Sequence, residues 1–471
     1  MPHADPPPTH PPTTPPPASL DRLLSRTAKL SRDLVVDGDT RMSGVHLEQA
    51  TQRCAGGLLA AGVDTDDVVA WRATVSWQTI VLLRACWRIG AVAAPLHQRL
   101  GDPEAATLAA SLGATVADVG EMADGPPVLS GTRPVPASGR ALILHTAGSS
   151  GAPKAVIHTH AALAHKARQM VSLHALTEDD VVMVPTPLAH ISGVLYALLV
   201  PIAVPMRAVL MGRWDSDVGA GLIEAERVTF MAGPPTFFTD LAGNGRALDS
   251  LRLISCGGAG VTPEFCRAMA ERFGAVVKRT YGSTEAPSVA TAWAGDPVER
   301  GWNFDGRAVP GAELRIAEAS ELLVRGPELF AGYLDPVATA AAVDGDGWFH
   351  TGDRATIDAD GWLTITGRLK ELIIRGGENI SPADVEAQLV AHPSVRAASA
   401  IGVPDERLGE RVGALVVADA PFDLAECRRW FDERGVARQQ WPERVERVDS
   451  IPLLASGKPD RLAIAQLMAR S

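Results

Sequence analysis

Between residues 142 and 316, short runs of β-branched and aliphatic residues alternate with segments whose apolar residues recur at helical spacing. The strands predicted from these runs are 142–145, 181–184, 228–232, 251–255 and 275–278. Strands that alternate with helices are typical of parallel βαβ units, so the chain is predicted to be an α/β protein. Ligands of such sheets bind beyond the carboxyl ends of the strands, and the loops there are the expected binding site.

The chain is predicted to comprise a tail and two folded domains. Residues 1–18 include nine prolines within the first seventeen positions, so we expect a disordered, Pro-rich tail. Residues 19–369 are predicted to form a large N-terminal domain of α/β layers and β-sheets. The turn signal Asp-Ala-Asp-Gly at 358–361 marks a change of character, and residues 370–471 are predicted to form a small, mobile α+β domain. We place the hinge at Lys370.

The composition indicates a globular protein with a large core, since 46% of the residues are hydrophobic and 21% are charged. The net charge of −11 argues against a protein that coats nucleic acid, which needs a basic face. The five cysteines have no metal-ligand spacing, so we expect neither disulfides nor zinc and assign the chain to the cytoplasm. No run of eighteen apolar residues exists, and we expect no membrane span and no signal peptide.

The first candidate binding segment begins at His145 and reads His-Thr-Ala-Gly-Ser-Ser-Gly-Ala-Pro-Lys. Its glycines let backbone N–H groups approach an anion, and its hydroxyl groups donate to phosphate oxygens. Lys154, at its end, adds a positive charge. The spacing is not that of a Walker A loop, in which Gly-Lys-Ser/Thr stand together. Taken alone, such a loop is more often a flexible turn than a phosphate site.

Four further segments follow along the chain. In Tyr-Gly-Ser-Thr-Glu, directly after a predicted strand, Thr284 can donate to a phosphate and Glu285 can bind Mg²⁺. In Trp-Phe-His-Thr-Gly-Asp, the carboxylate of Asp353 is suited to accept hydrogen bonds from ribose hydroxyls. The last two contain Arg368 and Lys458. Each of these segments is a weak signal by itself, because a lone polar residue in a loop is normally solvated.

In their joint order the five segments resemble those of the adenylate-forming superfamily of acyl-CoA synthetases, carrier-protein adenylation domains and luciferases. The resemblance runs from about residue 20 to the C-terminus. It implies an acyl-CoA synthetase, an ATP-dependent acid–thiol ligase that forms an acyl-adenylate and then transfers the acyl group to coenzyme A. It also implies Mg²⁺ as the metal ion, and a small domain that rotates between the two half-reactions.

The resemblance assigns roles to individual residues of this chain. Those matched to ATP or AMP binding are Thr146, Gly148, Ser149, Ser150, Gly151, Lys154, Gly257, Gly258, Ala259, Tyr281, Gly282, Ser283, Thr284, Asp353 and Arg368. Those matched to catalysis are Lys458, His190, Thr284 and Glu285, with Glu285 as the Mg²⁺ ligand. Those matched to the acyl pocket are His190, Ile191, Val194, Ala232, Gly233, Gly257 and Tyr281. Those matched to the pantetheine arm of coenzyme A are Gly376, Gly377 and Glu378, and Lys370 matches the hinge.

The first segment departs from the common pattern of the family. The chain has Ala155 where relatives mostly have Gly, and Ala147, Ser149 and Ser150 where Ser and Thr-Thr are commoner. Because these positions touch the expected triphosphate loop, an enzyme that uses a preformed acyl-adenylate and forms only the thioester stays open. So do a stand-alone enzyme that loads a carrier protein, a luciferase-like oxygenase and, from another class, a non-catalytic binder of nucleotide or acyl-adenylate.

The carboxylic acid is predicted from the character of the pocket positions. Most are small or aliphatic, and no Lys or Arg is evident to pair with a second carboxylate, so we expect a hydrophobic monocarboxylic acid. A bulky cyclic or aromatic acid is favoured over a long straight chain. A homodimer is expected from the family alone. The histidines at positions 158, 160, 165 and 174 are assigned to helix or loop surfaces.

Overall fold

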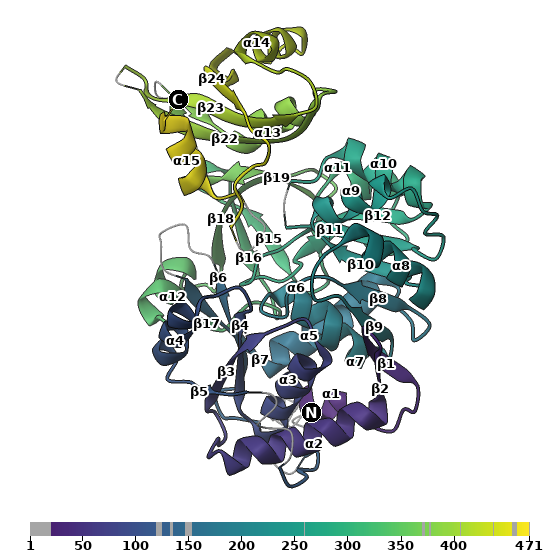
Figure 1. The fold of residues 1–471 in the computed structure, drawn as a ribbon. Coiled ribbons are helices and arrows are strands. Elements are labelled where there is room, and N and C mark those ends of the chain that lie inside the picture. Colours follow the sequence, from purple (N-terminus) through teal and green to yellow (C-terminus); the bar gives the residue numbers. More distant parts are fainter. Residues whose placement is uncertain are drawn as a thin grey trace, which may run out of the picture.

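The computed structural model describes residues 20–118, 125–131, 135–146, 153–258, 260–369, 373–375, 378–405, 407–436, 438–454 and 459–470. These residues form a large body of two sheets with helices packed on them, and a smaller body with a sheet of its own (Figure 1). The expected α/β class is confirmed by the alternation of strands and helices through most of the large body. In this part of the chain no helix combines the length and the apolar character that crossing a bilayer requires.

In the described residues, thirteen strands form the largest sheet, in the order β15-β16-β18-β19-β14-β13-β12-β11-β10-β8-β9-β1-β2. Their bounds are β1 (Asp33–Asp37), β2 (Thr40–Ser43), β8 (Val181–Val184), β9 (Arg207–Leu210), β10 (Phe230–Gly233), β11 (Leu253–Gly257), β12 (Val276–Tyr281), β13 (Ala290–Thr291), β14 (Gly306–Ala308), β15 (Glu313–Ile316), β16 (Glu321–Arg325), β18 (Phe349–Ile357) and β19 (Trp362–Arg368). Strands β8 to β12 pair in parallel. The helices that connect β9 to β10, β10 to β11 and β11 to β12 are α8 (Ser216–Glu226), α9 (Pro235–Gly243) and α10 (Pro263–Phe273). This is the βαβ arrangement that the sequence predicts.

Beyond β12 the prediction of parallel pairing is wrong. β13 pairs antiparallel with β12 and with β14, and β15, β16, β18 and β19 form an antiparallel ladder. The connections β12–β13, β14–β15, β15–β16 and β18–β19 are too short for a parallel crossover, which needs a dozen or more residues. The turn at 358–361 joins β18 to β19, with Gly361 at a φ of +83°. The helical segments of this region are α11 (Val298–Asn303), the 3₁₀ turn η2 (Glu318–Ser320) and α12 (Pro336–Ala342).

The second sheet of the large body has the order β17-β7-β6-β4-β3-β5 among the described strands. Their bounds are β3 (Val68–Ala73), β4 (Val92–His97), β5 (Thr115–Val116), β6 (Arg140–Thr146), β7 (Lys154–Thr159) and β17 (Gly332–Tyr333). β6 and β7 pair antiparallel, with Thr146 opposite Lys154, and β17 pairs with the far edge of β7. The first candidate segment therefore spans the connection of a two-stranded hairpin.

Helices on and between the two sheets supply most of the large core. They are α1 (Leu20–Leu24), α2 (Gly44–Ala60), α3 (Trp77–Ile89), α4 (Asp102–Ser111), α5 (His160–His174), α6 (Ile191–Val194), the π-helix η1 (Leu195–Leu199) and α7 (Val200–Ala203). The last three run on as one helical segment, and every residue of its π-helical middle is buried. Arg88 of α3 is fully buried and ties α1 in place through a 2.6 Å ion pair with Asp21.

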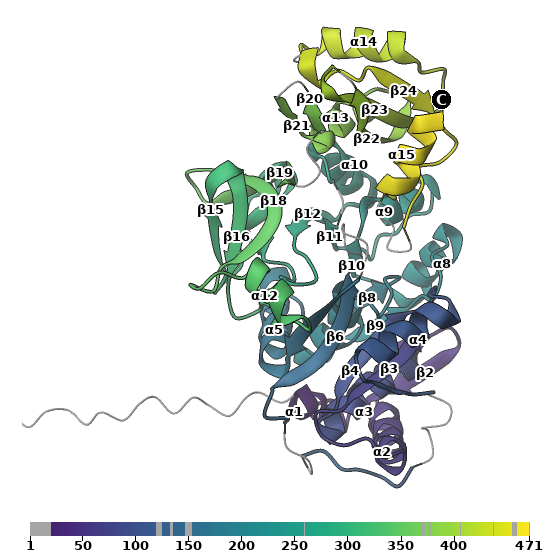
Figure 2. The same cartoon turned by 90° about the vertical axis from the view of Figure 1, so that its left-hand side faces the viewer.

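The small body follows β19 and has a separate core. Its elements are β20 (Ile373–Arg375), β21 (Glu378–Ile380), α13 (Pro382–Val390), β22 (Val395–Asp405), β23 (Gly409–Ala418), α14 (Leu424–Glu433), the 3₁₀ turn η4 (Arg438–Gln440), β24 (Arg444–Arg447) and α15 (Arg461–Arg470). Figure 2 shows it standing at one end of the large body. The hydroxyl of Ser381 joins the two by donating to the Thr366 carbonyl at 2.9 Å. Lys370 lies outside the described residues, so the hinge and the domain boundary remain predictions.

Candidate active site

The segment that follows β12 folds back on itself. The Ser283 amide donates to the Ala286 carbonyl at 3.0 Å, and the Ala286 amide donates to the Ser283 hydroxyl at 3.1 Å. A Cβ atom on Gly282 would lie 2.2 Å from the Ser288 amide nitrogen, so only glycine fits there. The tight turn holds Thr284 and Glu285 at the carboxyl end of a parallel strand, the position expected for a ligand site.

Glu285 is held at both its backbone and its side chain. The Phe330 amide donates to the Glu285 carbonyl, and the Tyr333 hydroxyl donates to Oε1 of Glu285, each at 2.8 Å. Burial and the neighbouring carboxylate raise the pKa of Tyr333, so its hydroxyl keeps the proton that it donates. Sequence reasoning missed Tyr333, because only the pairing of β17 with β7 brings residue 333 beside this loop.

Lys154 lies on the other side of Tyr333. Its ammonium stands 4.6 Å from the centroid of the tyrosine ring, a cation–π contact. Alternation along β7 places Lys154, Val156 and His158 on one face, while Ala155 packs against the cluster of buried residues on the opposite face. Lys154, Tyr333 and Glu285 therefore form one continuous row. The loop residues Gly148, Ser149, Ser150 and Gly151 lie outside the described part of the chain, and Thr146 ends β6.

Tyr281, Asp353 and Arg368 meet in a second group. The Tyr281 hydroxyl donates to Oδ2 of Asp353 at 2.6 Å, and Nε of Arg368 lies 2.8 Å from Oδ1 of the same carboxylate. Asp353 and Arg368 are cross-strand partners in β18 and β19, which fixes their separation. Burial, followed by the charge of Asp353, raises the pKa of Tyr281 well above its usual value. Three residues matched to ATP or AMP binding are thus joined to one another through the carboxylate of Asp353.

The glycines predicted near adenine stand at the end of β11. A Cβ atom on Gly257 would lie 2.3 Å from the Thr280 carbonyl oxygen, so glycine is required for β11 and β12 to pair closely. Gly258 adopts a φ of +80°, which favours glycine. Ala259 lies outside the described residues. Hydroxyls of Ser255 and Thr280, 2.7 Å apart, add a polar contact below these glycines that the sequence did not predict.

The predicted acyl-pocket residues come from strand ends and from the start of α6. Ala232 and Gly233 end β10 beside Gly257 of β11 and Tyr281 of β12, so these four share one edge of the sheet. A Cβ on Gly233 would lie 2.8 Å from the ring of Phe237, a neighbour that the sequence did not predict.

His190 and Ile191 stand where α6 begins. His190 caps the helix, and its ring centroid lies 5.5 Å from that of His97, also not predicted. Ile191 is partly buried, whereas Val194 is fully buried within the largest hydrophobic cluster. Val194 thus packs in the core, while His190 and Ile191 are more exposed, and the assignment of all three to the acyl pocket stays a prediction.

Three histidines assigned to the surface are buried, so that prediction is wrong. His158, His160 and His174 are each at most 2% exposed. Burial lowers the pKa of His158 and of His160 to about 4, and lowers that of His174 well below its usual value. For His160 and His174 the assignment failed because α5 is packed around most of its circumference, which its sequence period does not reveal. His158 belongs to the strand β7 and lies on one of its buried faces. His165 is only partly buried.

The residues assigned to the second half-reaction lie largely outside the described part of the chain. This applies to Lys458, Lys370, Gly376 and Gly377 and to the side chain of Glu378, whose backbone begins β21. Their positions relative to the large body stay predictions.

The surroundings of Glu285 fit a magnesium ion that is bound mainly by a nucleotide. Among the described residues no group of three or more His, Cys, Asp or Glu side chains could hold a metal ion. Mg²⁺ in nucleotide sites is bound by one or two carboxylates, phosphate oxygens and water, rather than by an all-protein cage. A single carboxylate with one oxygen fixed by Tyr333 meets that requirement.

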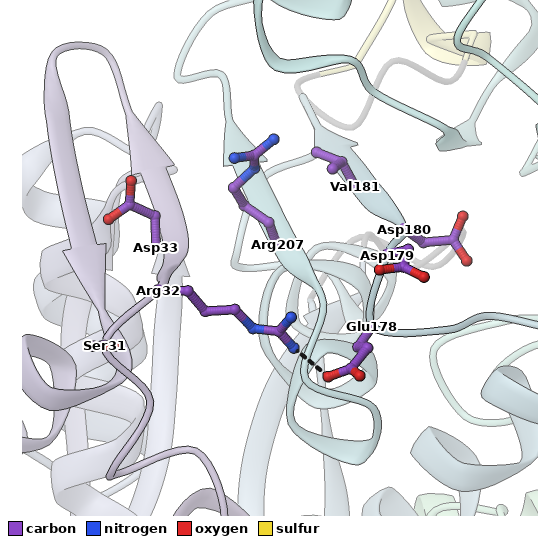
Figure 3. Close-up of a pocket in the computed structure, with 8 residues that line it drawn as sticks. All are labelled: Ser31, Arg32, Asp33, Glu178, Asp179, Asp180, Val181 and Arg207. Atoms are coloured by element: carbon purple, nitrogen blue, oxygen red, sulfur yellow. Dashed lines mark hydrogen bonds and ion pairs between the residues drawn. The ribbon is translucent and has the colours of Figure 1, made fainter.

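A separate pocket of about 500 Å³ lies far from these groups, at the amino ends of β8 and β9 (Figure 3). Four of the charged side chains that line it are in the following ion pairs: Arg32 with Glu178 at 2.8 Å, Asp180 with Arg252 at 2.7 Å, and Arg207 with Glu226 at 3.7 Å. Parallel sheets bind ligands at the opposite edge, and none of the predicted site residues lines this pocket.

Comparison with known proteins matches both parts of the chain to one enzyme family. A family model described as AMP-binding enzyme matches residues 25–124 and 117–334, and one described as AMP-binding enzyme C-terminal domain matches residues 384–458. A medium-chain fatty-acid–CoA ligase of Escherichia coli (strain K12) is 30% identical, over 96% of this chain and 91% of the relative.

Other relatives carry aromatic acids in their names. A feruloyl-CoA synthase of an Amycolatopsis species is 34% identical over 89% of this chain and 93% of the relative. An indoleacetate–CoA ligase of Aromatoleum aromaticum is 32% identical over 91% of this chain and 94% of the relative. Among solved structures, ATP-bound MatB from Rhodopseudomonas palustris superposes with a TM-score of 0.88 at 28% identity, covering 96% of this chain and 99% of that chain.

Proposed function

This chain belongs to the AMP-binding enzyme family and is an AMP-forming acid–CoA ligase, and on that basis we propose that it adenylates a hydrophobic, ring-containing carboxylic acid before transferring it to coenzyme A. ATP and coenzyme A are then its co-substrates. The observation that carries the proposal is the meeting of two groups around the end of β12: Tyr281 with Asp353 and Arg368, and Glu285 with Tyr333 and Lys154.

The chemistry explains why these side chains are needed. A carboxylate oxygen attacks the α-phosphorus of ATP and pyrophosphate leaves; the thiol of coenzyme A then attacks the acyl carbon and AMP leaves. The first step brings two anions together, and a pair of unit charges about 4 Å apart repels by about 4 kcal/mol at an effective dielectric near 20. Mg²⁺ beside Glu285 supplies positive charge to the triphosphate. Lys154 and Lys458 add positive charge at the phosphates and at the attacking carboxylate.

We propose that separate groups of residues bind the nucleoside and the phosphates of ATP. Asp353 presents one carboxylate to the ribose hydroxyls, and Arg368 and Tyr281 fix its orientation through one bond to each oxygen. Glu285 and Lys154 lie along the row that ends at the hairpin of β6 and β7, where we propose that the triphosphate binds. In the second half-reaction we propose that rotation about Lys370 replaces Lys458 by the Gly376-Gly377 segment, whose lack of side chains leaves room for the pantetheine arm.

Retention of adenylation is favoured over an enzyme that only forms thioesters. The departure at Ala155 raised that alternative, because the position is next to Lys154. The methyl group of Ala155 packs against the buried cluster on the far face of β7, away from the row of Lys154 and Tyr333. The methyl group therefore occupies space in the core. It does not change the face of β7 that carries Lys154, where we propose that the triphosphate binds, so replacing glycine by alanine at this position should not affect that face.

The proposed acid class rests on the pocket edge and on the relatives. Ala232, Gly233 and Gly257 have small side chains or none, which leaves room for a wide group at the strand ends. Phe237, whose ring lies beside Gly233 and packs on Trp214, adds an aromatic surface at this edge. Two of the relatives are named for acids with aromatic rings, ferulate and indoleacetate, and one for medium-chain fatty acids.

The test follows acyl-CoA formation by mass spectrometry in two parallel arms over one panel of hydrophobic acids. One arm receives free acid, ATP, Mg²⁺ and coenzyme A, and the other receives synthetic acyl-adenylate and coenzyme A. Product in both arms, with ring acids ahead of straight chains, is expected. Product from the acyl-adenylate alone would overturn the adenylation step, and product from straight chains alone would overturn the acid class. A phosphopantetheinylated carrier protein that replaces coenzyme A tests the alternative acceptor.

A further inference from the structure

Beneath the loop of Glu285, two charged side chains are buried against each other. Lys166 of α5 and Glu328, which precedes β17, are each 1% exposed, and Nζ of Lys166 lies 3.5 Å from Oε1 of Glu328. Neither residue belongs to the segments that predict function. A buried ion pair is costly to desolvate, so its presence is weak evidence that it stabilises the fold. The contacts that the pair makes with neighbouring segments indicate its role instead.

The ammonium of Lys166 uses all three of its protons. Besides Glu328, it donates to the side-chain oxygen of Gln169 and, at 3.2 Å, to the carbonyl of Ser288. Gln169 in turn donates to the Pro310 carbonyl at 2.7 Å. Burial lowers the pKa of Lys166 to about 8, which leaves the group mostly charged at neutral pH. Lys166 is thus a junction between α5, the loop after β12 and the segment that leads to β17.

Ser288 is the end of the loop that carries Glu285. It adopts a left-handed φ of +46°, which is uncommon for serine, and its amide lies against Gly282, where a Cβ would clash at 2.2 Å. Fixing the Ser288 carbonyl therefore fixes both ends of the turn. The bond from Lys166 holds in place a conformation that this residue would otherwise adopt rarely.

Glu328 begins the segment that holds Glu285 from the other side. Two residues after it, the Phe330 amide donates to the Glu285 carbonyl, and five residues after it, the Tyr333 hydroxyl donates to the Glu285 carboxylate. Oε2 of Glu328 has no hydrogen-bond partner within the described residues and lies near Gly326, where a Cβ would approach it to 2.7 Å. Its contact with Lys166 anchors the start of this segment, whose later part is held by the pairing of β17 with β7.

We propose that Lys166 and Glu328 are positioning residues that hold the carboxylate of Glu285 in place for Mg²⁺ and the triphosphate. The proposal rests on the proposed function, because it concerns the adenylation step. Lys166 contacts both segments that hold Glu285 in place. One is the loop of Glu285 itself, which ends at Ser288, and the other runs from Glu328 to Tyr333. Partners of this kind outside a metal site typically change metal affinity by 10–100-fold when removed.

The test uses the double variant Lys166→Met/Glu328→Met, which leaves no unpaired buried charge and is expected to fold. The matched control is Arg325→Met/Glu313→Met. These two residues form an exposed ion pair on β16 and β15 at 2.8 Å, outside the loop of Glu285 and outside the segment from Glu328 to Tyr333. Pyrophosphate exchange is measured against Mg²⁺ concentration, and thioester formation from synthetic acyl-adenylate is measured in parallel. Hydrogen exchange of peptides 282–289 and 328–334 reports the loop directly.

The double variant is expected to need about tenfold more Mg²⁺ for half-maximal exchange, with thioester formation within about twofold of the parent. The amides of Ala286 and Phe330 are expected to exchange several-fold faster than in the parent and the control. Unchanged Mg²⁺ dependence together with unchanged hydrogen exchange would overturn the proposal. If the double variant does not fold, Glu328→Gln, which keeps the shape, is measured in the same way and is expected to move both readouts in the same direction.

The two proposals fail in different ways. A parent enzyme without pyrophosphate exchange that still forms thioester would overturn the adenylation step. Hydrogen exchange at Phe330 then still decides whether Lys166 and Glu328 hold the loop, because that measurement needs no substrate.

Discussion

The hydroxyl of Tyr333 donates a 2.8 Å hydrogen bond to Oε1 of Glu285, although 47 intervening positions separate the two in the chain. The bond restrains the rotation of the carboxylate plane and leaves Oε2 as the oxygen that we propose binds Mg²⁺. Orienting bonds to a metal-binding carboxylate matter because the ion tolerates little deviation in its ligand geometry.

Tyr333→Phe is expected to lower the rate of adenylation about tenfold and to raise the Mg²⁺ requirement, since a hydrogen bond to a charged group contributes about 1.5–3 kcal/mol. Pyrophosphate exchange measures both. In a double-mutant cycle with Glu285→Gln, the two losses should not add, because Tyr333 acts through Glu285. Additive losses would mean that the hydroxyl acts elsewhere.

Asp353→Asn is expected to weaken both half-reactions. Ribose is present in ATP and in the acyl-adenylate, so the KM for ATP and the KM for acyl-adenylate should each rise roughly 10-fold, the loss of about one charge-assisted hydrogen bond. The variant Asp360→Asn, in the exposed turn between the same two strands, is the control. A rise in the KM for ATP without a rise in the KM for acyl-adenylate would indicate that Asp353 contacts the phosphates instead of the ribose.

Lys458→Ala is expected to slow adenylation by roughly 10²–10³-fold, the scale of losing one positioned donor to the transition state. Thioester formation from acyl-adenylate should stay close to normal, because the second half-reaction does not use this lysine. Single-turnover assays of the two half-reactions measure the split, with Lys29→Ala at an exposed position as the control. Normal adenylation by the variant would remove Lys458 from the mechanism.

Stability is expected to fall as the pH drops below about 6.5. The pKa of His158 and that of His160 are about 4 in the folded protein, below the usual value of 6.5, so the unfolded chain takes up protons first. The stabilisation is complete above pH 6.5 and is lost as the pH falls towards 4. At pH 5.5 each histidine should cost about 1.4 kcal/mol of unfolding free energy.

Urea unfolding at pH 7.5 and pH 5.5 measures this loss before most carboxylates titrate. His158→Leu should remove about a third of it, because His160 and His174 are also buried with lowered pKa values. An equal loss in the variant and the parent would assign the pH dependence to other groups.

The central parallel strands could be predicted from sequence because they are buried on both faces and form continuous apolar runs, as at Val181–Val184. Asp353 and Arg368 were found through a family pattern, and their cross-strand pairing follows from a hairpin turn signal between them. Tyr333, Lys166 and Glu328 could not be predicted. Each acquires its role from a contact between distant segments, such as β17 on β7, and no local period encodes such a contact.

The π-helix of Leu195–Leu199 allows the segment from Ile191 to Ala203 to absorb a change of one residue in chain length. A π turn accommodates one residue more than an α turn, whereas an extra residue in a regular α-helix would rotate what precedes it by about 100°. Deleting a single residue there would restore a regular α-helix and leave the start of α6 at Ile191 in the same orientation relative to α7. Relatives that differ by one residue at this point would therefore present equivalent side chains to the acid, so comparisons of specificity should place an alignment gap within the π turn and compare the residues on either side of it.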